Sequence, residues 1–307
     1  MKAAFIEQNG GPDVLKYGDM PDPVAGPGDV LIDIHAASVN GADWKVRAGE
    51  YAKLTFPYIL GRDFSGTVAA LGDGVGDFRV GDPVFGVCAA GQEGAYAEKI
   101  AVKAAIVAKK PDRLSHVDAA ALALTGLTAM SAIEDTIKLQ RGETILIQGG
   151  AGGVASFAIQ IAKHIGARVI TTASAPNHDY LRKLGADEVI DYNKQDFTKA
   201  VSNVDAVFET VGGDVAKRSF EVLRPGGRAA FIASGPQAPK PERDDVSSLR
   251  PPVGRARKPL ERIAELYLSG AVRAPEVTLY DLSKAADAHR VSEGRHLRGK
   301  MVFQIRR

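Results

Sequence analysis

The sequence is poor in cysteine and contains no long apolar run. Its single cysteine, Cys88, cannot form an internal disulfide or supply a cysteine-rich zinc site. The six histidines are scattered without the spacing of metal ligands, so we expect no bound metal. The N-terminal MKAAFIEQNGG lacks the apolar core of a signal peptide, and no segment is expected to reach the ~20 apolar residues that cross a bilayer. These shortages favour a cytoplasmic protein without a membrane partner.

The chain also lacks an excess of either charge. Lys and Arg number 39 and Asp and Glu number 37, which leaves a net charge of +2. A nucleic acid or an acidic membrane is therefore not expected as the main partner. With 307 residues, 45% of them hydrophobic, the chain is long enough for two domains with ordinary cores.

Alternating apolar residues in the first third predict short β-strands. Val30, Ile32, Ile34 and Ala36 share one face of the run 29–40. Glycine turns separate this run from several similar ones. The pattern is typical of a compact barrel or sandwich.

After Pro111 the pattern changes to helices and then to an alternation of strands and helices. A capping signal at Ser115 and a break at Thr125-Gly126 predict two helices in the segment 115–139. Strand-like and helical runs alternate from 144 to 234, which predicts a parallel sheet with helices on both faces. The proline-rich run 236–259 is either a long loop or an edge strand. A helix that ends near Gly270 and a C-terminal strand complete the prediction.

A glycine-rich turn joins the first strand of this alternation to its helix. In LIQGGAGGVA, Gly149, Gly152 and Ala155 follow the spacing G-x-x-G-x-x-A. In a dinucleotide-binding fold, the first glycine permits the tight turn and the second lets a pyrophosphate approach the backbone, while the third small residue allows close packing. The exposed N–H groups and the helix dipole favour the anion. We therefore predict a dinucleotide loop that also includes Gly150, Ala151, Gly153 and Val154.

The end of the next strand discriminates between NAD and NADP. NAD-binding versions place Asp or Glu about 20 residues after the glycines, where it holds the ribose 2′-hydroxyl. Here the strand ends at Ser174, and no acidic residue lies between Gly149 and Asp179. Thr172 and Ser174 would not repel a 2′-phosphate, so we expect NADP(H). Four nearby side chains are candidate donors to that phosphate: Lys163, His178, Lys183 and Tyr192.

Eight segments spread over nearly the whole chain carry a family resemblance. They are VNGADWKVRAGEY, LGRDFSGTV, GVGDFRVGDPVFG, LTGLTA, LIQGGAGGVA, KLGADEVIDY, FETVGG and ADAHRVSEGRHLRGKMV. The chain resembles the medium-chain dehydrogenase/reductase superfamily, in particular its zinc-free quinone oxidoreductases related to zeta-crystallin. The resemblance implies an α/β protein with a GroES-like β-rich catalytic domain at 1–122 and 259–307. It also implies a Rossmann NADP-binding domain, a doubly wound parallel sheet, at 123–258, and a possible homodimer.

The resemblance implies chemistry without zinc. Asn40 stands where zinc-dependent members have a cysteine ligand, and Gly61-Arg62-Asp63 stands where they have Gly-His-Glu. Without a Lewis acid, nothing lowers the pKa of an alcohol hydroxyl, whereas a quinone or an α,β-unsaturated carbonyl accepts hydride directly. We therefore expect NADPH-dependent hydride transfer to a quinone, enone or enal.

The resemblance also implies roles for individual residues. Asn40, Tyr51 and Lys45 match positions near the nicotinamide, where the Asn40 amide could donate to a substrate oxygen and the Tyr51 hydroxyl could protonate it. Asp43, Arg62 and Asp63 are expected to form ion pairs. Further cofactor contacts are expected from Thr125, Thr210, Val211, Ser234, Gly299 and Lys300, with Lys300 reaching the cofactor phosphates.

Two other functions fit the same motifs. An enoyl-thioester reductase would use the same cofactor and would need a cleft that admits a pantetheine chain. A non-catalytic NADPH-binding protein, structural or RNA-associated, would bind NADPH tightly without turnover and would bind RNA in a salt-sensitive manner. A screen of quinones, alkenals and enoyl thioesters separates these functions.

Overall fold

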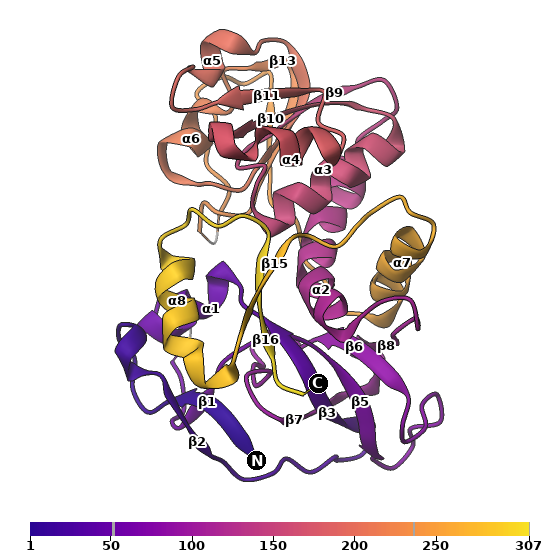
Figure 1. The fold of residues 1–307 in the computed structure, drawn as a ribbon. Helices are drawn as coiled ribbons and strands as arrows, with labels where there is room; N and C mark the ends of the chain where they lie inside the picture. Colours follow the sequence, from indigo (N-terminus) through magenta and orange to yellow (C-terminus); the bar gives the residue numbers. More distant parts are fainter. Residues whose placement is uncertain (51–52, 236, 307) are drawn as a thin grey trace. The chain divides into compact units, whose positions relative to one another are not determined.

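A computed structural model describes residues 1–50, 53–235 and 237–306. The chain forms two compact units (Figure 1). Unit 1 comprises Met1–Leu124, Arg255–Ser269 and Ala274–Arg307, and unit 2 comprises Thr125–Gly254 and Gly270–Arg273. Unit 1 therefore combines the two ends of the chain.

Unit 1 is built around a seven-stranded sheet. Its order is β15-β16-β3-β5-β6-β8, with β7 also paired to β3, and all pairs except β15 with β16 are antiparallel. The strands are β3 (Asp29–Ser38), β5 (Asp63–Leu71), β6 (Pro83–Val87), β7 (Lys99–Lys103), β8 (Val107–Lys109), β15 (Val277–Tyr280) and β16 (Lys300–Gln304). A C-terminal strand was predicted, and β16 confirms it by pairing with β3.

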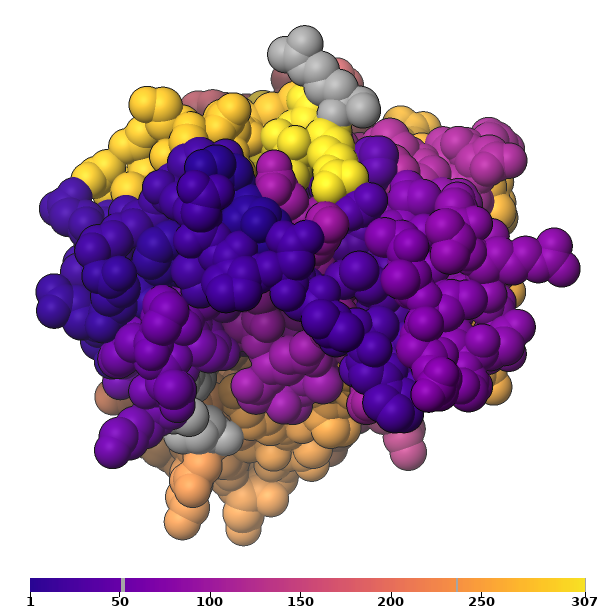
Figure 2. Space-filling model, turned by 90° about the horizontal axis from the view of Figure 1, so that it is seen from below, coloured from indigo at the N-terminus to yellow at the C-terminus, as the bar shows by residue number. Residues whose placement is uncertain are grey.

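A second sheet, three whole helices and the first part of the helix His116–Met130 complete the described part of unit 1. The small sheet has the order β2-β1-β4, formed by β1 (Lys2–Ile6), β2 (Lys16–Asp19) and β4 (Tyr58–Ile59). The helices are α1 (Gly41–Ala48), α7 (Arg257–Leu268) and α8 (Ala285–Glu293), with short 3-10 turns at Pro12–Val14, Ala104–Ile106 and Leu282–Lys284. Helix α8 packs against α1 and the first 3-10 turn. N-terminal and C-terminal residues therefore lie side by side at the surface of this unit (Figure 2).

The core of unit 1 follows the alternation read from the sequence. Val30, Ile32, Ile34 and Ala36 of β3 are all fully buried. The residues between them are only partly buried, because successive side chains of a strand point to opposite faces. The predicted inward face of β3 is confirmed.

Unit 2 contains a six-stranded, wholly parallel sheet in the order β11-β10-β9-β12-β13-β14. The strands are β9 (Thr144–Ile147), β10 (Arg168–Ala173), β11 (Glu188–Asp191), β12 (Val204–Glu209), β13 (Leu223–Phe231) and β14 (Ser247–Leu249). In chain order this is 3-2-1-4-5-6, the strand order of the Rossmann fold. The predicted fold class is confirmed. In the proline-rich run, Ser247–Leu249 form the short edge strand β14, and the other described residues from 237 to 256 are irregular.

The helices of unit 2 follow its strands. They are α3 (Gly153–Ile165), α4 (His178–Lys183), α5 (Phe197–Ala200) and α6 (Gly213–Arg218), with a 3-10 turn at Ala175–Asn177. Helix α3 ends at Gly166, whose positive φ of 96° lets the backbone close the helix, as predicted.

The prediction of two helices in the segment 115–139 is wrong. Thr125 and Gly126 lie inside α2 (His116–Met130), which continues without a break into a π-helical turn at Ser131–Thr136. A glycine in a helix interior costs only about 1 kcal/mol relative to alanine. Packing outweighs this cost, because Ala119 to Ala123 are fully buried. The predicted capping signal is present, since the Ser115 hydroxyl accepts a hydrogen bond from the Asp118 backbone N–H at 3.0 Å.

The same helix also corrects the expectation about apolar length. His116–Thr136 spans 21 residues and is long and apolar enough to cross a membrane, the one such helix in the described parts of the chain. Of its most apolar window, 78% is buried inside the protein. The expectation that no segment reaches this length is therefore wrong, and the burial is that of a core helix.

Candidate functional site

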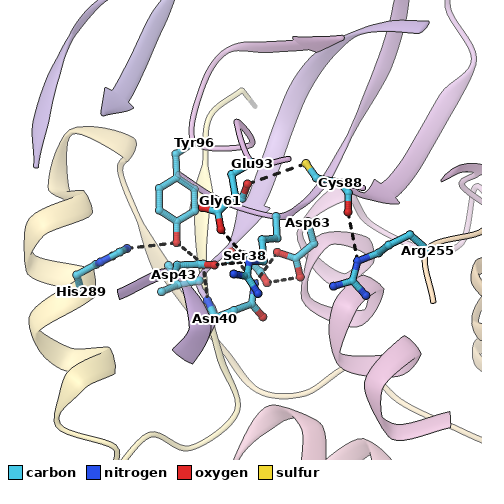
Figure 3. A network of polar contacts seen from close by, with 12 residues as sticks. Ser38, Asn40, Asp43, Gly61, Asp63, Cys88, Glu93, Tyr96, Arg255 and His289 are labelled. Carbon is cyan, nitrogen blue, oxygen red and sulfur yellow. Dashed lines mark hydrogen bonds and ion pairs between the residues drawn. The ribbon is translucent and has the colours of Figure 1, made fainter. Parts of the chain in front are cut away.

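Unit 1 holds a buried polar network where β3 ends and α1 begins (Figure 3). Asn40 is the residue before α1. Its amide nitrogen donates to Asp63 Oδ1 at 2.9 Å and to the Ser38 carbonyl at 3.3 Å. Its amide oxygen accepts from Lys300 Nζ at 2.7 Å. The Ser38 hydroxyl donates to the other oxygen of Asp63 at 2.8 Å, so the carboxylate is bonded on both oxygens.

Asp43 connects the start of α1 to the rest of the network. Its Oδ2 accepts the Asn40 backbone N–H at 2.8 Å, as the acidic residue of a capping box does. The same oxygen accepts the Tyr96 hydroxyl at 2.7 Å. Arg62 Nε lies 3.6 Å from Asp43 Oδ1, which confirms the expected ion pair between these two residues. Asp63 instead bonds Ser38 and Asn40.

Arg62 bridges two buried carboxyl groups. Its Nε donates to Glu93 Oε1 at 2.9 Å. Burial, and secondly the nearby charge of Asp43, raise the pKa of Glu93 to about 7, although Arg62 opposes this. Burial also raises the pKa of Asp43. Asp43 Oδ1 and Glu93 Oε2 have no hydrogen-bond partner among the described residues. Two carboxyl groups that share one guanidinium in this way favour retention of a proton.

A second branch of the network joins α1 to α8. Arg47 Nη1 lies 2.9 Å from His289 Nδ1, and since arginine can only donate, that nitrogen is the acceptor. His289 Nε2 therefore carries the proton and lies 3.4 Å from the Tyr96 hydroxyl, which donates to Asp43. Burial, and then the charge of Arg47, lower the pKa of His289 to about 3, so this imidazole is neutral at physiological pH. Arg47 also forms an ion pair with Glu293.

Of the predicted catalytic residues, Lys45 makes no contact that joins it to this network, and Tyr51 is not among the residues that the structure describes. Lys45 is half-buried on α1, and its ammonium lies 5.6 Å from the ring centre of Trp44. The network members Ser38, Glu93, Tyr96 and His289 were missed by the sequence reasoning. Only the Asn40-x-x-Asp43 capping pattern was available as a local signal for α1.

The residues of this network do not fit a zinc ion. Asn40 has its amide oxygen on an ammonium group, and Arg62 is a cation held against two carboxyl groups. Cys88 is the single thiol of the chain, and burial raises its pKa well above the usual value. Within the part of the chain that the structure describes, no three His, Cys, Asp or Glu side chains are grouped to hold a metal.

In unit 2, the glycine loop is tightly folded against β10. Gly149 has a positive φ of 71°, and its N–H donates to the Thr172 hydroxyl at 3.0 Å. The Gly150 N–H donates to the Thr172 carbonyl at 2.9 Å. A Cβ at Gly150 would lie 2.2 Å from Thr171 Oγ1, so only glycine fits there. Thr172 thus supports the loop.

The start of α3 fits an anion. Gly152 precedes the helix and has no side chain to cap it. The first N–H groups of a helix, here those of Gly153, Val154 and Ala155, have no acceptor within the helix. With the helix dipole, they form a site for a pyrophosphate, and Ala151 lies in the turn before it. These residues therefore fit a dinucleotide.

The carboxyl ends of β9 and β12 are joined beside this loop. The Thr210 hydroxyl donates to the Gln148 carbonyl at 2.8 Å, and Thr172 Oγ1 donates to Gln148 Oε1 at 2.7 Å. Glu209 Oε1 accepts the backbone N–H groups of Val211 and Gly212 at 2.6 and 2.7 Å. Burial raises the pKa of Glu209. Gln148 and Glu209 were missed, because their roles depend on neighbouring strands.

The end of β10 presents small polar groups. Ser174 Oγ accepts from Asn177 Nδ2 at 3.1 Å, and His178 Nε2 lies 3.3 Å from the Ala173 carbonyl. Lys163 Nζ is bonded to both carboxylate oxygens of Asp187, at 2.9 and 2.8 Å, and is thereby occupied. Tyr192 is 49% exposed.

The remaining predicted cofactor residues are divided between the units. Thr125 and Ser234 belong to unit 2, where Thr125 is buried and Ser234 Oγ donates to the Gln237 carbonyl at 3.3 Å. Gly299 and Lys300 belong to unit 1. Gly299 has a positive φ of 70°, and a Cβ there would lie 2.0 Å from the Glu276 carbonyl oxygen.

Comparison with known proteins places the chain in a family. A family model described as alcohol dehydrogenase GroES-like domain matches residues 26–112, and one described as zinc-binding dehydrogenase matches 184–303. The quinone oxidoreductase from Coxiella burnetii is 36% identical, with a TM-score of 0.94 over 100% of this chain and 99% of that one. The Escherichia coli quinone oxidoreductase complexed with NADPH is 26% identical, with a TM-score of 0.91 over 99% and 100%.

A curated relative extends the comparison. The chloroplastic NADPH-dependent alkenal/one oxidoreductase of Arabidopsis thaliana is 33% identical over 98% of this chain and 79% of its own length. The chain belongs to the medium-chain dehydrogenase/reductase superfamily, in its quinone oxidoreductase branch. It is accordingly an NAD(P)H-dependent oxidoreductase.

Proposed function

We propose that the protein is a zinc-independent reductase that uses NADPH to transfer hydride to a quinone or an α,β-unsaturated carbonyl compound. The observation that carries the proposal is the glycine loop, where an uncapped helix start lies beside a strand that ends without a carboxylate. The quinone and alkenal/one reductases among its relatives support this choice of acceptor.

The preference for NADPH rests on the end of β10. An acidic residue there would repel a 2′-phosphate, whereas Ser174, Asn177 and His178 are uncharged or able to donate hydrogen bonds. Asn177 is a further candidate donor to the 2′-phosphate, because its amide nitrogen lies 3.1 Å from Ser174 Oγ at the end of β10. Lys163 is no longer a candidate donor to this phosphate, because its ammonium forms an ion pair with Asp187.

The chemistry follows from the cofactor and the residues that position the reactants. NADPH supplies the hydride when bound. The loop N–H groups of Gly153 and Val154 would hold its pyrophosphate, and the rigid contacts of Gly149 and Gly150 to Thr172 would fix the loop for binding. An acceptor with an activated double bond needs orientation and stabilisation of the developing oxygen charge, and these need no metal.

The test is a screen for NADPH oxidation with 1,2-naphthoquinone, a 2-alkenal and an enoyl thioester, with NADH in parallel. We expect turnover with at least one of the first two acceptors and a higher kcat/KM with NADPH. Turnover of the thioester alone would favour an enoyl-thioester reductase. Tight NADPH binding without any turnover would refute the proposal and favour the non-catalytic role.

The cellular location, the partners and the oligomeric state of the protein are part of the same proposal. We propose a cytoplasmic enzyme that acts on a small molecule without nucleic acid or membrane partners, and a homodimer that pairs through the edge strand β14. Light scattering tests the dimer, and a mass equal to one chain would refute it.

A further inference from the structure

Lys300 occupies a position that a phosphate-binding lysine would not take. It is only 5% exposed, and its ammonium donates to the Val39 carbonyl and to Asn40 Oδ1, each at 2.7 Å. The backbone fixes this position, because β16 begins at Lys300 and the Val39 N–H donates to the Met301 carbonyl at 2.9 Å. An ammonium held in this way offers little surface to a cofactor phosphate.

The charges on either side of Asn40 fix the orientation of its amide. The amide oxygen faces the ammonium of Lys300, and the amide nitrogen faces the carboxylate of Asp63. A flipped amide would direct its N–H groups at the ammonium and its oxygen at the carboxylate, so both contacts would become repulsive. The orientation therefore follows from electrostatics.

This orientation leaves the Asn40 side chain without a donor for an acceptor molecule. An asparagine amide has two N–H groups, and here they face Asp63 Oδ1 at 2.9 Å and the Ser38 carbonyl at 3.3 Å. The expected role of Asn40 as a hydrogen-bond donor to the substrate would require one of these bonds to break.

The burial of the ammonium adds an energetic reason for the arrangement. Burial lowers the pKa of Lys300, and the nearby charges of Asp63 and then Asp43 act in the opposite direction. The amide of Asn40 lies between the opposite charges of Lys300 and Asp63, with its dipole aligned to both. Removing either charge leaves the other buried with fewer partners, which is costly.

We propose that Lys300 is a positioning residue of the reductase, which acts with Asp63 to clamp the Asn40 amide and so fixes the start of helix α1. This proposal rests on the proposed function, since it concerns the segment that carries Lys45 and leads to Tyr51. It replaces the expected contact between Lys300 and the cofactor phosphates. Loss of the clamp should therefore impair use of the acceptor much more than binding of NADPH.

The first test is the variant Lys300→Met, with the exposed Lys103→Met as its control. Calorimetry measures the NADPH dissociation constant, and steady-state kinetics with 1,2-naphthoquinone measures kcat and KM. We expect a fall in kcat/KM for the acceptor of about tenfold or more, because misplacement by about 1 Å can cost about a hundredfold. We expect the NADPH dissociation constant to change by less than about threefold. A tenfold weakening of NADPH binding with unchanged acceptor kinetics would instead assign Lys300 to the phosphates.

A charge-balanced variant separates positioning from a purely structural role. Lys300→Met combined with Asp63→Asn removes both buried charges and should recover folding if Lys300→Met alone unfolds. The amide introduced by Asp63→Asn can donate as well as accept, so the Asn40 amide loses its fixed orientation. Under our proposal, stability recovers while kcat/KM stays low. Recovery of both would overturn the proposal.

A readout without turnover keeps the clamp testable if the proposed acceptors fail. Selective ¹⁵N labelling of asparagine reports hydrogen exchange of the Asn40 side-chain amide. We expect strong protection in the wild type and in Lys103→Met, and faster exchange in the double variant. Rapid exchange in the wild type would refute the clamp, whatever the acceptor screen shows.

Discussion

Replacing Glu93 with glutamine removes a charge that the fold holds at a cost. The Glu93 side chain is only 4% exposed, and its pKa is raised from 4.5 to about 7 by burial and by Asp43. At about 1.4 kcal/mol per pKa unit, ionised Glu93 is about 3 kcal/mol less favourable in the folded than in the unfolded chain. Glutamine keeps the shape of the protonated side chain and cannot ionise.

The direction in which stability changes with pH follows from proton binding at Glu93. Between pH 4.5 and about 7 the folded protein binds more protons at Glu93 than the unfolded chain, so this group lowers stability as pH rises through the window. The penalty is absent below pH 4.5 and complete above pH 7. The free energy of unfolding of Glu93→Gln, relative to wild type, should therefore increase by about 3 kcal/mol from about pH 4.5 to about pH 8.

Urea unfolding followed by the fluorescence of the single tryptophan, Trp44, measures this difference at both pH values. The exposed Glu261→Gln serves as a control and should show the same difference from wild type at each pH. A stability difference for Glu93→Gln that does not change with pH would show that folding does not raise the pKa of Glu93, which would refute the reasoning.

Substitutions at four further positions test the site. Ser174→Asp should lower the ratio of kcat/KM for NADPH over NADH by about tenfold or more through repulsion of the 2′-phosphate, whereas Ser174→Asn should change it little; an unchanged ratio would place the phosphate elsewhere. Gly150→Ala should destabilise the protein by about 1–3 kcal/mol in urea unfolding, because its Cβ would lie 2.2 Å from Thr171 Oγ1. Gly152→Ala, whose Cβ would lie 3.5 Å from the Gly149 carbonyl oxygen, should retain stability and weaken NADPH binding in calorimetry. Tyr96→Phe should cost about 1–3 kcal/mol, because Asp43 loses a buried donor; wild-type stability would show that the bond contributes little.

Patterns within short segments of the sequence predicted those features of the fold that neighbouring residues determine, such as the buried face of a strand and the end of a helix. The alternation in β3 showed its buried face, and Gly166 showed the end of α3. The break predicted at Gly126 failed because burial of α2 outweighs the small helix cost of one glycine. Helix α1 was not predicted, although Asn40 and Asp43 have the spacing of a helix start.

The polar network of unit 1 was beyond prediction because its bonds join distant residues. The bond from Lys300 to Asn40 spans 260 positions, and the contact of Arg47 with His289 spans 242. Nothing in the sequence around Glu93 indicates that its carboxyl group is buried with Asp43 and Arg62. The pairing of β16 and β5 with β3 and the packing of α8 on α1 bring part of the network together. Backbone bonds such as that from the Gly94 N–H to the Gly61 carbonyl bring the segment of Glu93 to Arg62.

The case of Asn40 shows what a match to a family position leaves open. The position and residue type indicated a side chain able to donate to a substrate oxygen. The functional capacity of an amide depends on which of its donors are already bonded, and here Asp63 and the Ser38 carbonyl take both. The same holds for the cation Lys300, because its ammonium group already donates to Asn40 Oδ1 and to the Val39 carbonyl. The groups that meet the acceptor must therefore be sought among side chains whose hydrogen-bonding capacity the fold has not already used.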